Sequence, residues 1–120
     1  MKTIVCYGDS NTHGTVPMLH LNDNARYAPD DRWPGVLRGA LGEGYDVIEE
    51  GLPGRTTVWA DPIEGVYKNG HACLPACLET HAPIDLVILL LGTNDLKKRF
   101  SLSPMDVARG NATLLATIAH

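Results

Sequence analysis

Residues 84–95 read IDLVILLLGTND, and the fold can be argued outward from this stretch. Six consecutive aliphatic residues, Leu86 to Leu91, lead into the turn-forming residues Gly92 to Asp95. A short continuous apolar run closed by a glycine turn is typical of a strand that is buried on both faces of a parallel sheet. The stretch therefore predicts a strand over Ile84–Leu91.

Two further strands are predicted nearer the N-terminus. Residues 3–7 form an apolar, β-branched run that is closed by Gly8-Asp9, and residues 45–49 form a second run that is stopped by Gly51, Pro53 and Gly54. The segments 15–31 and 55–69 are rich in turn-forming residues and are predicted as loops.

Between the predicted strands, apolar residues recur at the spacing of a helix. Residues 33–41 are predicted as a helix that is capped by Asp31 and ends at Gly42 or Gly44. A second helix is expected from about Gly70 to His81, although Pro75 should kink it or delay its start.

The last predicted helix starts at Ser103-Pro104-Met105-Asp106, which supplies a serine cap, a proline at the first position and a carboxylate at the third. Ala108, Ala112, Leu115 and Ala119 are predicted to share one face of this helix, with Leu114 and Ile118 adjacent. Strands that alternate with helices indicate an α/β fold, a three-layer, doubly wound parallel sheet. Residues 1–120 are expected to form a single domain.

Composition excludes several functional classes. A net charge of −4 argues against a nucleic-acid or membrane partner, and the run Lys97-Lys98-Arg99 is interpreted as a solvated loop. The cysteines, Cys6, Cys73 and Cys77, lack metal or disulfide spacing and are expected as buried or half-buried thiols. No secretory or membrane-spanning stretch is visible, so a cytoplasmic location is expected. We expect no cofactor and no metal, because neither a dinucleotide-binding nor a Walker glycine pattern occurs.

A small polar group and a glycine follow each predicted strand, where ligands bind in a doubly wound sheet. These loops are Gly8-Asp9-Ser10-Asn11, Gly51-Leu52-Pro53-Gly54 and Gly92-Thr93-Asn94-Asp95. Each sequence taken alone is also a common turn. Together they offer what acyl transfer needs, which is a hydroxyl nucleophile at Ser10 and fixed donors for a developing oxyanion.

The three loops, in this order, resemble those of the SGNH (GDSL-like) hydrolases, and within them bacterial arylesterases and acyltransferases. The resemblance covers essentially the whole chain. It rests on residues 7–12, 32–33, 47–52, 54–57, 80–88 and 91–96.

The resemblance implies a serine esterase acting on carboxylic esters, aryl or short-chain alkyl, with possible transfer of the acyl group to alcohols. Ser10 would be the nucleophile, and the oxyanion hole would comprise the Ser10 N–H, the Gly54 N–H and the Asn94 side chain. Asp9 and Asp95 would brace the loops that carry Ser10 and Asn94. A homo-oligomer is a further implication.

The family's general base lies in a late Asp-x-x-His block, and residues 1–120 contain no such block. His13, three residues after Ser10, is interpreted as a residue at the rim of the site, with a substitute base as the minor alternative. We therefore expect a domain that is incomplete at its C-terminus, with the triad Asp and His supplied by a further segment. The other interpretation is a truncated or degenerate domain that acts as a non-catalytic binding or assembly module.

Overall fold

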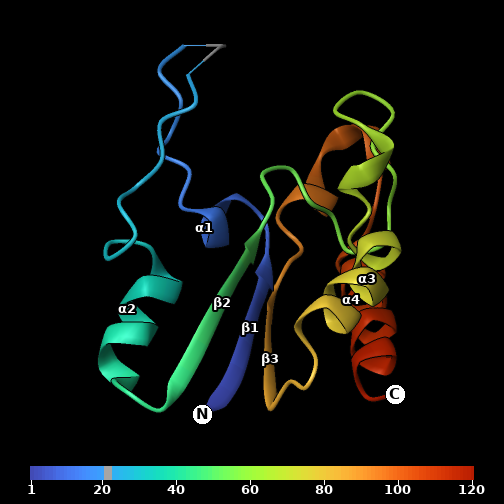
Figure 1. The fold of residues 1–120 in the computed structure, drawn as a ribbon. Helices are drawn as coiled ribbons and strands as arrows, with labels where there is room; N and C mark the ends of the chain where they lie inside the picture. The colour runs from blue at the N-terminus through green and yellow to red at the C-terminus, as the bar shows by residue number, and fades with distance from the viewer. Residues whose placement is uncertain (21–22) are drawn as a thin grey trace. The chain divides into compact units, whose positions relative to one another are not determined.

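The computed structural model describes residues 1–20 and 23–120, which form two compact units (Figure 1). The first unit comprises Met1–Pro53 and Pro83–Leu90, and the second comprises Gly54–Ala82 and Leu91–His120. The predicted loop 15–31 includes residues 21 and 22, which lie outside the described residues. The single-domain organisation stays a prediction.

The first unit is built on a parallel sheet, as the sequence predicts (Figure 1). Strands β1 (Lys2–Gly8), β2 (Tyr45–Gly51) and β3 (Leu86–Leu90) lie in the order β2-β1-β3. The central strand β1 is buried from Ile4 to Gly8. Its carboxyl end pairs with that of β2 at Gly8 and Gly51 and with that of β3 at Gly8 and Leu90.

Strand β3 is shorter than the predicted Ile84–Leu91. Just before its start, the Asp85 carboxylate accepts a hydrogen bond from the Thr3 N–H (2.8 Å). This side chain therefore occupies the place that a backbone carbonyl would have if the strand began earlier. At its other end the pairing stops at Leu90, because β1 ends at Gly8. Leu86 and Leu90 are about half exposed, so the expected burial on both faces holds for β1 and not for β3.

Helix α2 (Trp33–Leu41) covers part of the sheet. Its N-cap is Arg32, with no side-chain capping bond, so the prediction of Asp31 as the cap is wrong. Gly42 ends the helix at a φ of 72°, as predicted, because a glycine adopts this conformation without a Cβ penalty. Apolar residues from β1, β2, α2 and β3 form the core of this unit: Ile4, Cys6, Val47, Trp33, Leu37, Leu41 and Ile88.

The second unit is helical. It contains α3 (Gly70–His81), α4 (Pro104–Ile118) and three 3₁₀ turns, η1 (Val66–Lys68), η2 (Asn94–Leu96) and η3 (Lys98–Phe100). Helix α3 begins at Gly70 despite Pro75, so the expected later start is wrong. The Asn69 side chain fixes this start because it accepts hydrogen bonds from the His71 and Ala72 N–H groups.

Helix α4 has the predicted cap, and of the residues predicted on or beside its shared face only Leu114 is buried. Ser103 and Asp106 form a reciprocal capping box at its start. The buried residues are Gly110 and Leu114, whereas Ala108, Ala112, Leu115 and Ala119 are all exposed. Gly110 carries no hydrophobic signal in the sequence, yet it is buried because the Thr57 side chain lies directly against it. None of the helices in the described ranges is long and apolar enough to cross a membrane.

Candidate active site

Ser10 is the first residue of the short helix α1 (Ser10–His13), directly after the end of β1. The carboxylate of the buried Asp9 accepts a hydrogen bond from the Asn11 N–H (3.0 Å), and the Asp9 carbonyl accepts from the His13 N–H (2.9 Å). Gly14 then ends the turn with a φ of 86°. Ser10 therefore lies where backbone N–H groups have no acceptor within their own helix.

Two glycines allow this turn to pack closely onto the strand ends. A Cβ at Gly8 would overlap the Thr12 hydroxyl and lie 2.9 Å from the Leu90 carbonyl. A Cβ at Gly51 would overlap the backbone of His13. The Thr12 hydroxyl also accepts a hydrogen bond from the Trp33 indole N–H (3.2 Å), which ties the turn to α2. The position of Ser10 is thus fixed by its own unit.

His13 lies at the end of the same turn. Burial and the nearby Arg26 lower the pKa of His13, although a hydrogen bond with the Gly51 backbone opposes them. The imidazole is therefore neutral at neutral pH. The ring has a backbone partner and follows Ser10 by three residues, which is compatible with the rim position expected from the sequence.

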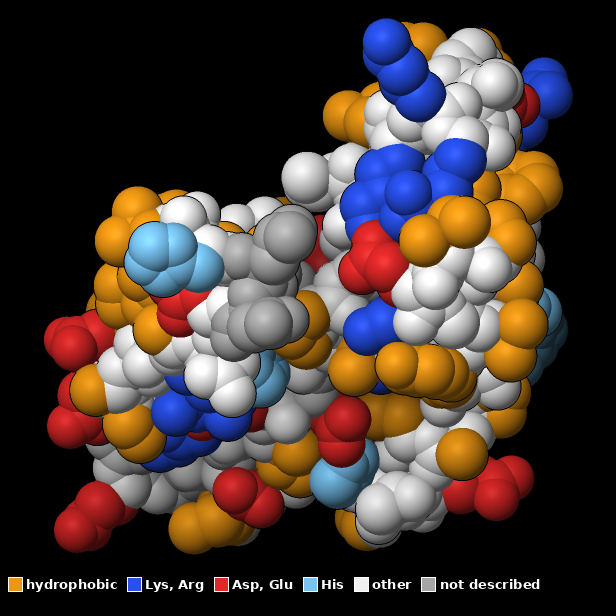
Figure 2. Space-filling view, turned by 90° about the horizontal axis from the view of Figure 1, so that it is seen from above, with side chains coloured by type: hydrophobic (Ala, Val, Ile, Leu, Met, Phe, Trp, Pro, Cys, Tyr) orange, Lys and Arg blue, Asp and Glu red, His pale blue; other side chains and the backbone are white. Residues whose placement is uncertain are grey.

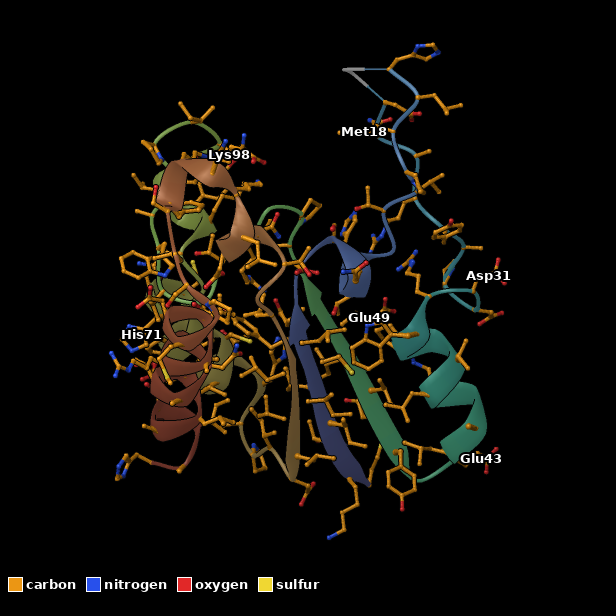
Figure 3. The ribbon with its side chains drawn as sticks, turned by 180° about the vertical axis from the view of Figure 1, so that it is seen from behind. Met18, Asp31, Glu43, Glu49, His71 and Lys98 are labelled. Atoms are coloured by element: carbon orange, nitrogen blue, oxygen red, sulfur yellow. The ribbon has the colours of Figure 1, made fainter. Side chains whose placement is uncertain are left out.

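A charged cluster joins β2 to α2 beside this turn. Glu49 pairs with Arg32 (3.1 Å) and with Arg38 (3.1 Å), and its side chain lies towards α2 (Figure 3). Burial pushes the pKa of Glu49 upwards, but the two arginines outweigh it and lower the pKa below its usual range. The ion pairs therefore hold both the start of α2, through Arg32, and its last turn, through Arg38, on the sheet.

In the second unit, Gly54 begins a turn that only glycine fits. Its φ is 80°, and a Cβ there would lie 2.9 Å from the Glu64 Oε1. The turn continues through Arg55, Thr56 and Thr57, all of which are buried. The backbone of Gly54 is therefore the only part of this residue that could contact a ligand.

Asn94 and Asp95 are bound to this turn by directed hydrogen bonds. The Asn94 Nδ2 donates to the Arg55 carbonyl (3.1 Å). Because a carbonyl can only accept, this bond orients the amide group and leaves its second N–H for another acceptor. The fully buried Asp95 carboxylate accepts from the Thr57 N–H (2.9 Å) and from the Thr57 hydroxyl (2.5 Å).

The run Lys97-Lys98-Arg99, predicted as a solvated loop, is largely paired with acids. Arg99 contacts Asp61 and Glu64 (2.8 Å each), and Lys97 contacts Glu64. The Arg99 guanidinium holds the pKa of the buried Asp61 well below its usual range. Figure 2 shows basic and acidic side chains adjoining on the surface. Two of the three cations are thus neutralised within their own unit, which disfavours a binding patch for anions.

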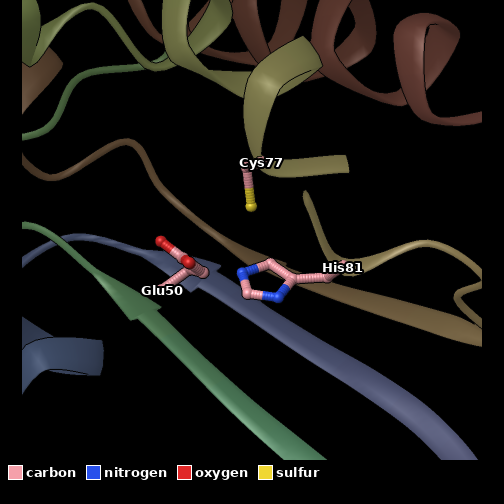
Figure 4. Close-up of side chains that lie close together, drawn as sticks. All are labelled: Glu50, Cys77 and His81. Carbon is pink, nitrogen blue, oxygen red and sulfur yellow. The ribbon is translucent and has the colours of Figure 1, made fainter. Parts of the chain in front are cut away.

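His71, His81, Cys73 and Cys77 lie on α3, outside these turns. His71 on α3 contacts the Thr117 hydroxyl on α4 (3.3 Å). Figure 4 draws Cys77 and His81, which lie one turn apart on α3, together with Glu50, which belongs to the first unit. None of the three cysteines, all in the described ranges, forms a disulfide, and Cys6 is buried while the other two are half-buried, as expected. Burial raises the pKa of Cys6 to about 11, with Glu49 adding to the effect.

The site residues predicted from sequence thus fall into two groups. Ser10, Asp9 and His13 share the turn after β1. Asn94 and Asp95, in the second unit, are hydrogen-bonded to the turn that Gly54 begins. Sequence reasoning missed the role of Thr57 in these hydrogen bonds. The Gly-Arg-Thr-Thr stretch at 54–57 was a signal for it, because these residues already carried part of the family resemblance.

Comparison with known families gives a match over nearly the whole chain. The model of the GDSL-like lipase/acylhydrolase family matches residues 6–119. A comparison with curated proteins gives no significant match.

Solved structures agree with the family match. The aryl esterase of M. smegmatis, in its inhibitor-bound form, is 48% identical with a TM-score of 0.92, over 97% of this chain and 54% of that one. Est24, a carbohydrate acetylesterase from Sinorhizobium meliloti, is 41% identical with a TM-score of 0.92 over the same shares. AlinE4, an SGNH-hydrolase family esterase, shares the fold at 23% identity, with a TM-score of 0.71 over 98% of this chain and 53% of that one. The chain therefore spans about half the length of the solved structures that it matches.

Proposed function

Because the chain belongs to the GDSL-like lipase/acylhydrolase family, we propose that it is part of a serine esterase whose nucleophile is Ser10. The observation that carries this proposal is the position of Ser10. It is the first residue of a helical turn that follows a buried central strand, in a turn fixed by Asp9, Gly8 and Gly51. A hydroxyl held in this way can approach an ester carbonyl without reorganising the backbone.

The proposed chemistry is acyl transfer through a covalent intermediate. The Ser10 oxygen attacks the carbonyl carbon of a carboxylic ester while a general base takes the hydroxyl proton. The tetrahedral intermediate then collapses, the base returns the proton to the departing alcohol, and an acyl-enzyme remains on Ser10. Water, or a second alcohol in the case of acyl transfer, releases the acyl group by the same steps in reverse.

We assign the oxyanion hole to the Ser10 N–H, the Gly54 N–H and the Asn94 side-chain amide. Donors of this kind stabilise the transition state because they are already oriented before charge develops on the carbonyl oxygen. Two features of the second unit support the assignment. Gly54 holds a φ of 80° that a residue with a side chain rarely adopts, and the bond to the Arg55 carbonyl holds the Asn94 amide in one orientation.

We place the general base on a segment outside residues 1–120. No histidine in these residues follows an aspartate by three positions, and the chain spans about half the length of the structures that it matches. His13 is the weaker candidate, since its ring is already bonded to the Gly51 backbone. Without a base, oxyanion stabilisation alone would leave only residual activity.

We propose small aryl or short-chain alkyl esters as substrates, with alcohols as alternative acyl acceptors. The neighbours named as an aryl esterase and as a carbohydrate acetylesterase support small acyl groups on either kind of alcohol. The pairing of Lys97 and Arg99 with acids in the second unit disfavours an anionic substrate there and supports a neutral small molecule. A cytoplasmic homo-oligomer is part of the same proposal.

The test uses the natural protein, with the sequence that its reading frame encodes beyond His120. A fluorophosphonate probe should label Ser10, and Ser10→Ala should abolish both labelling and hydrolysis of a chromogenic ester. Ser101→Ala is the matched control and should be labelled like the parent. Labelling at Ser101 or Ser103 would contradict the nucleophile. An unlabelled protein that still binds ester analogues would favour the non-catalytic binding module.

A further inference from the structure

Gly110 lies in the interior of α4, where helix propensity favours almost any residue other than glycine or proline. It lies in the middle of the fifteen-residue helix and is buried. Glycine in a helix interior costs about 1 kcal/mol relative to alanine, because it loses more backbone entropy on folding. A glycine here therefore indicates a close approach that a side chain would prevent.

The residue that approaches Gly110 is Thr57. A Cβ at position 110 would overlap the Thr57 hydroxyl and lie 2.9 Å from the Thr57 Cβ. The Thr57 side chain is fully buried, so it has little room to move aside. Any side chain at 110 would therefore displace the Thr57 hydroxyl from its present position.

That hydroxyl is one of the two groups that hold Asp95. It donates to one carboxylate oxygen at 2.5 Å, and the Thr57 N–H donates to the other at 2.9 Å. Asp95 directly follows Asn94 in η2. The side-chain amide of Asn94 donates to the Arg55 carbonyl. Gly110 in α4 is thus linked to Asn94 by its contact with Thr57, by the hydrogen bond from Thr57 to Asp95, and by the peptide bond between Asp95 and Asn94.

We propose that Gly110 is a positioning residue for the Asn94 amide and acts through Thr57 and Asp95. The inference rests on the proposed role of Asn94 as an oxyanion donor. Donors of this kind must be held within a fraction of an ångström, and a misplacement of about 1 Å costs on the order of 100-fold in rate. The absence of a side chain at 110 keeps Thr57, and therefore Asn94, in the productive position.

Gly110→Ala in the natural protein tests the proposal by steady-state kinetics on a chromogenic ester. We expect kcat to fall about 10- to 100-fold with little change in KM, because the lost interaction belongs to the transition state. Gly39→Ala is the matched control. Gly39 is also a helix glycine, in α2, but a Cβ there would meet no atom within 4 Å, so kcat should stay at the parent value.

Asn94→Ala provides the background that separates positioning from general destabilisation. If Gly110 acts through Asn94, then Gly110→Ala should lower kcat by less than about twofold in a variant that already carries Asn94→Ala. The reason is that the effects of two substitutions in one network of contacts are not additive. The same fold loss in both backgrounds would overturn the proposal, as would a Gly110→Ala variant with parental kcat. If Asn94→Ala itself keeps parental kcat, then the oxyanion assignment fails, and the inference fails with it.

Thr57→Val keeps the test decisive if Gly110→Ala does not fold. Valine has nearly the shape of threonine but cannot donate to Asp95, and it adds no atom near Gly110. The expected result is again a loss in kcat that disappears in the Asn94→Ala background. A parental kcat for a folded Thr57→Val variant would overturn the proposal.

Discussion

In the first unit the fully buried side chains are mainly apolar, as at Val5 and Tyr7, whereas in the second unit they are mainly polar, as at Thr57, Asp61 and Asp95. Apolar burial is not directional, and the register of a parallel sheet sets where Ser10 stands. Hydrogen bonds and ion pairs are directional, so the position of Asn94 depends on individual atoms. The two halves of the proposed site are therefore held by different forces.

This difference has a consequence for substitutions. The first unit should respond to changes in volume, and the second should respond to the exchange of a single oxygen or nitrogen at constant volume. A truncation of an apolar side chain should therefore destabilise the first unit more, and an exchange of one polar atom should destabilise the second unit more.

The largest effect on stability is expected from Ile4→Ala in β1. Ile4 is 6% exposed and lies in the core with Cys6 and Val47, so its truncation leaves a cavity. The free energy of unfolding should fall by about 2–5 kcal/mol in denaturant titrations. Leu86→Ala, at a half-exposed position of β3, is the control and should cost clearly less. Equal losses at the two positions would break the description of an apolar first unit.

Asp95→Asn tests the second unit at constant volume. Asparagine keeps one oxygen for the Thr57 N–H but places an NH2 group against the Thr57 hydroxyl, so the bond that this hydroxyl donates to the carboxylate is lost. We expect a loss of about 1–3 kcal/mol in the free energy of unfolding. The exposed Asp46→Asn should change it by less than about 0.5 kcal/mol. If Asp95→Asn lowered the free energy of unfolding as little as Asp46→Asn does, the contrast between the two units would be wrong.

Ser103→Ala should have a smaller effect. It removes the hydroxyl that accepts from the Asp106 N–H at the start of α4 (3.2 Å). Loss of such a cap costs about 1 kcal/mol, measurable as a lower melting temperature. Ser103→Thr keeps the acceptor and should remain near the parent. A fully stable Ser103→Ala variant would show that the cap does not contribute to the stability of α4.

The smallest effect is expected from the pH dependence of the same cap. Hydrogen bonds from the Ser103 N–H and hydroxyl lower the pKa of Asp106. The folded pKa lies below the unfolded value, so the stabilisation is complete above an unfolded pKa of about 3.9 and is lost as the pH falls through the folded value. Melting curves of Asp106→Asn and the parent should therefore converge in acid. A constant difference down to pH 2 would contradict the assignment.

Local signals in the sequence predicted much of the first unit and the ends of the helices. The strand at residues 3–7, the stop at Gly42 and the cap at Ser103 are each set by neighbours in the chain, and each is confirmed. Asp31 fails as a cap because the helix begins one residue later than such a cap requires, with Pro34 in its first turn. The boundary of a helix is decided by packing as much as by the preference of one residue.

The candidate site divides in the same way. Ser10, Gly54 and Asn94 could be singled out because each stands in a short motif whose order is specific. The bonds between Thr57 and Asp95 could not, because they join residues 38 positions apart and no periodicity connects them. Gly110 was invisible for a different reason, since its contribution is an absent side chain, and a search for chemistry in a sequence looks for groups that are present.

Cys6 gives the first unit a chemical reporter. With a pKa of about 11 and no exposed surface, its thiol stays protonated at neutral pH and is out of reach of alkylating reagents. Cys73 and Cys77 are partly exposed on α3, so a maleimide dye would mark only the second unit of the native protein. Modification of Cys6, followed by mass spectrometry, would then time the opening of the central strand, without any engineered label.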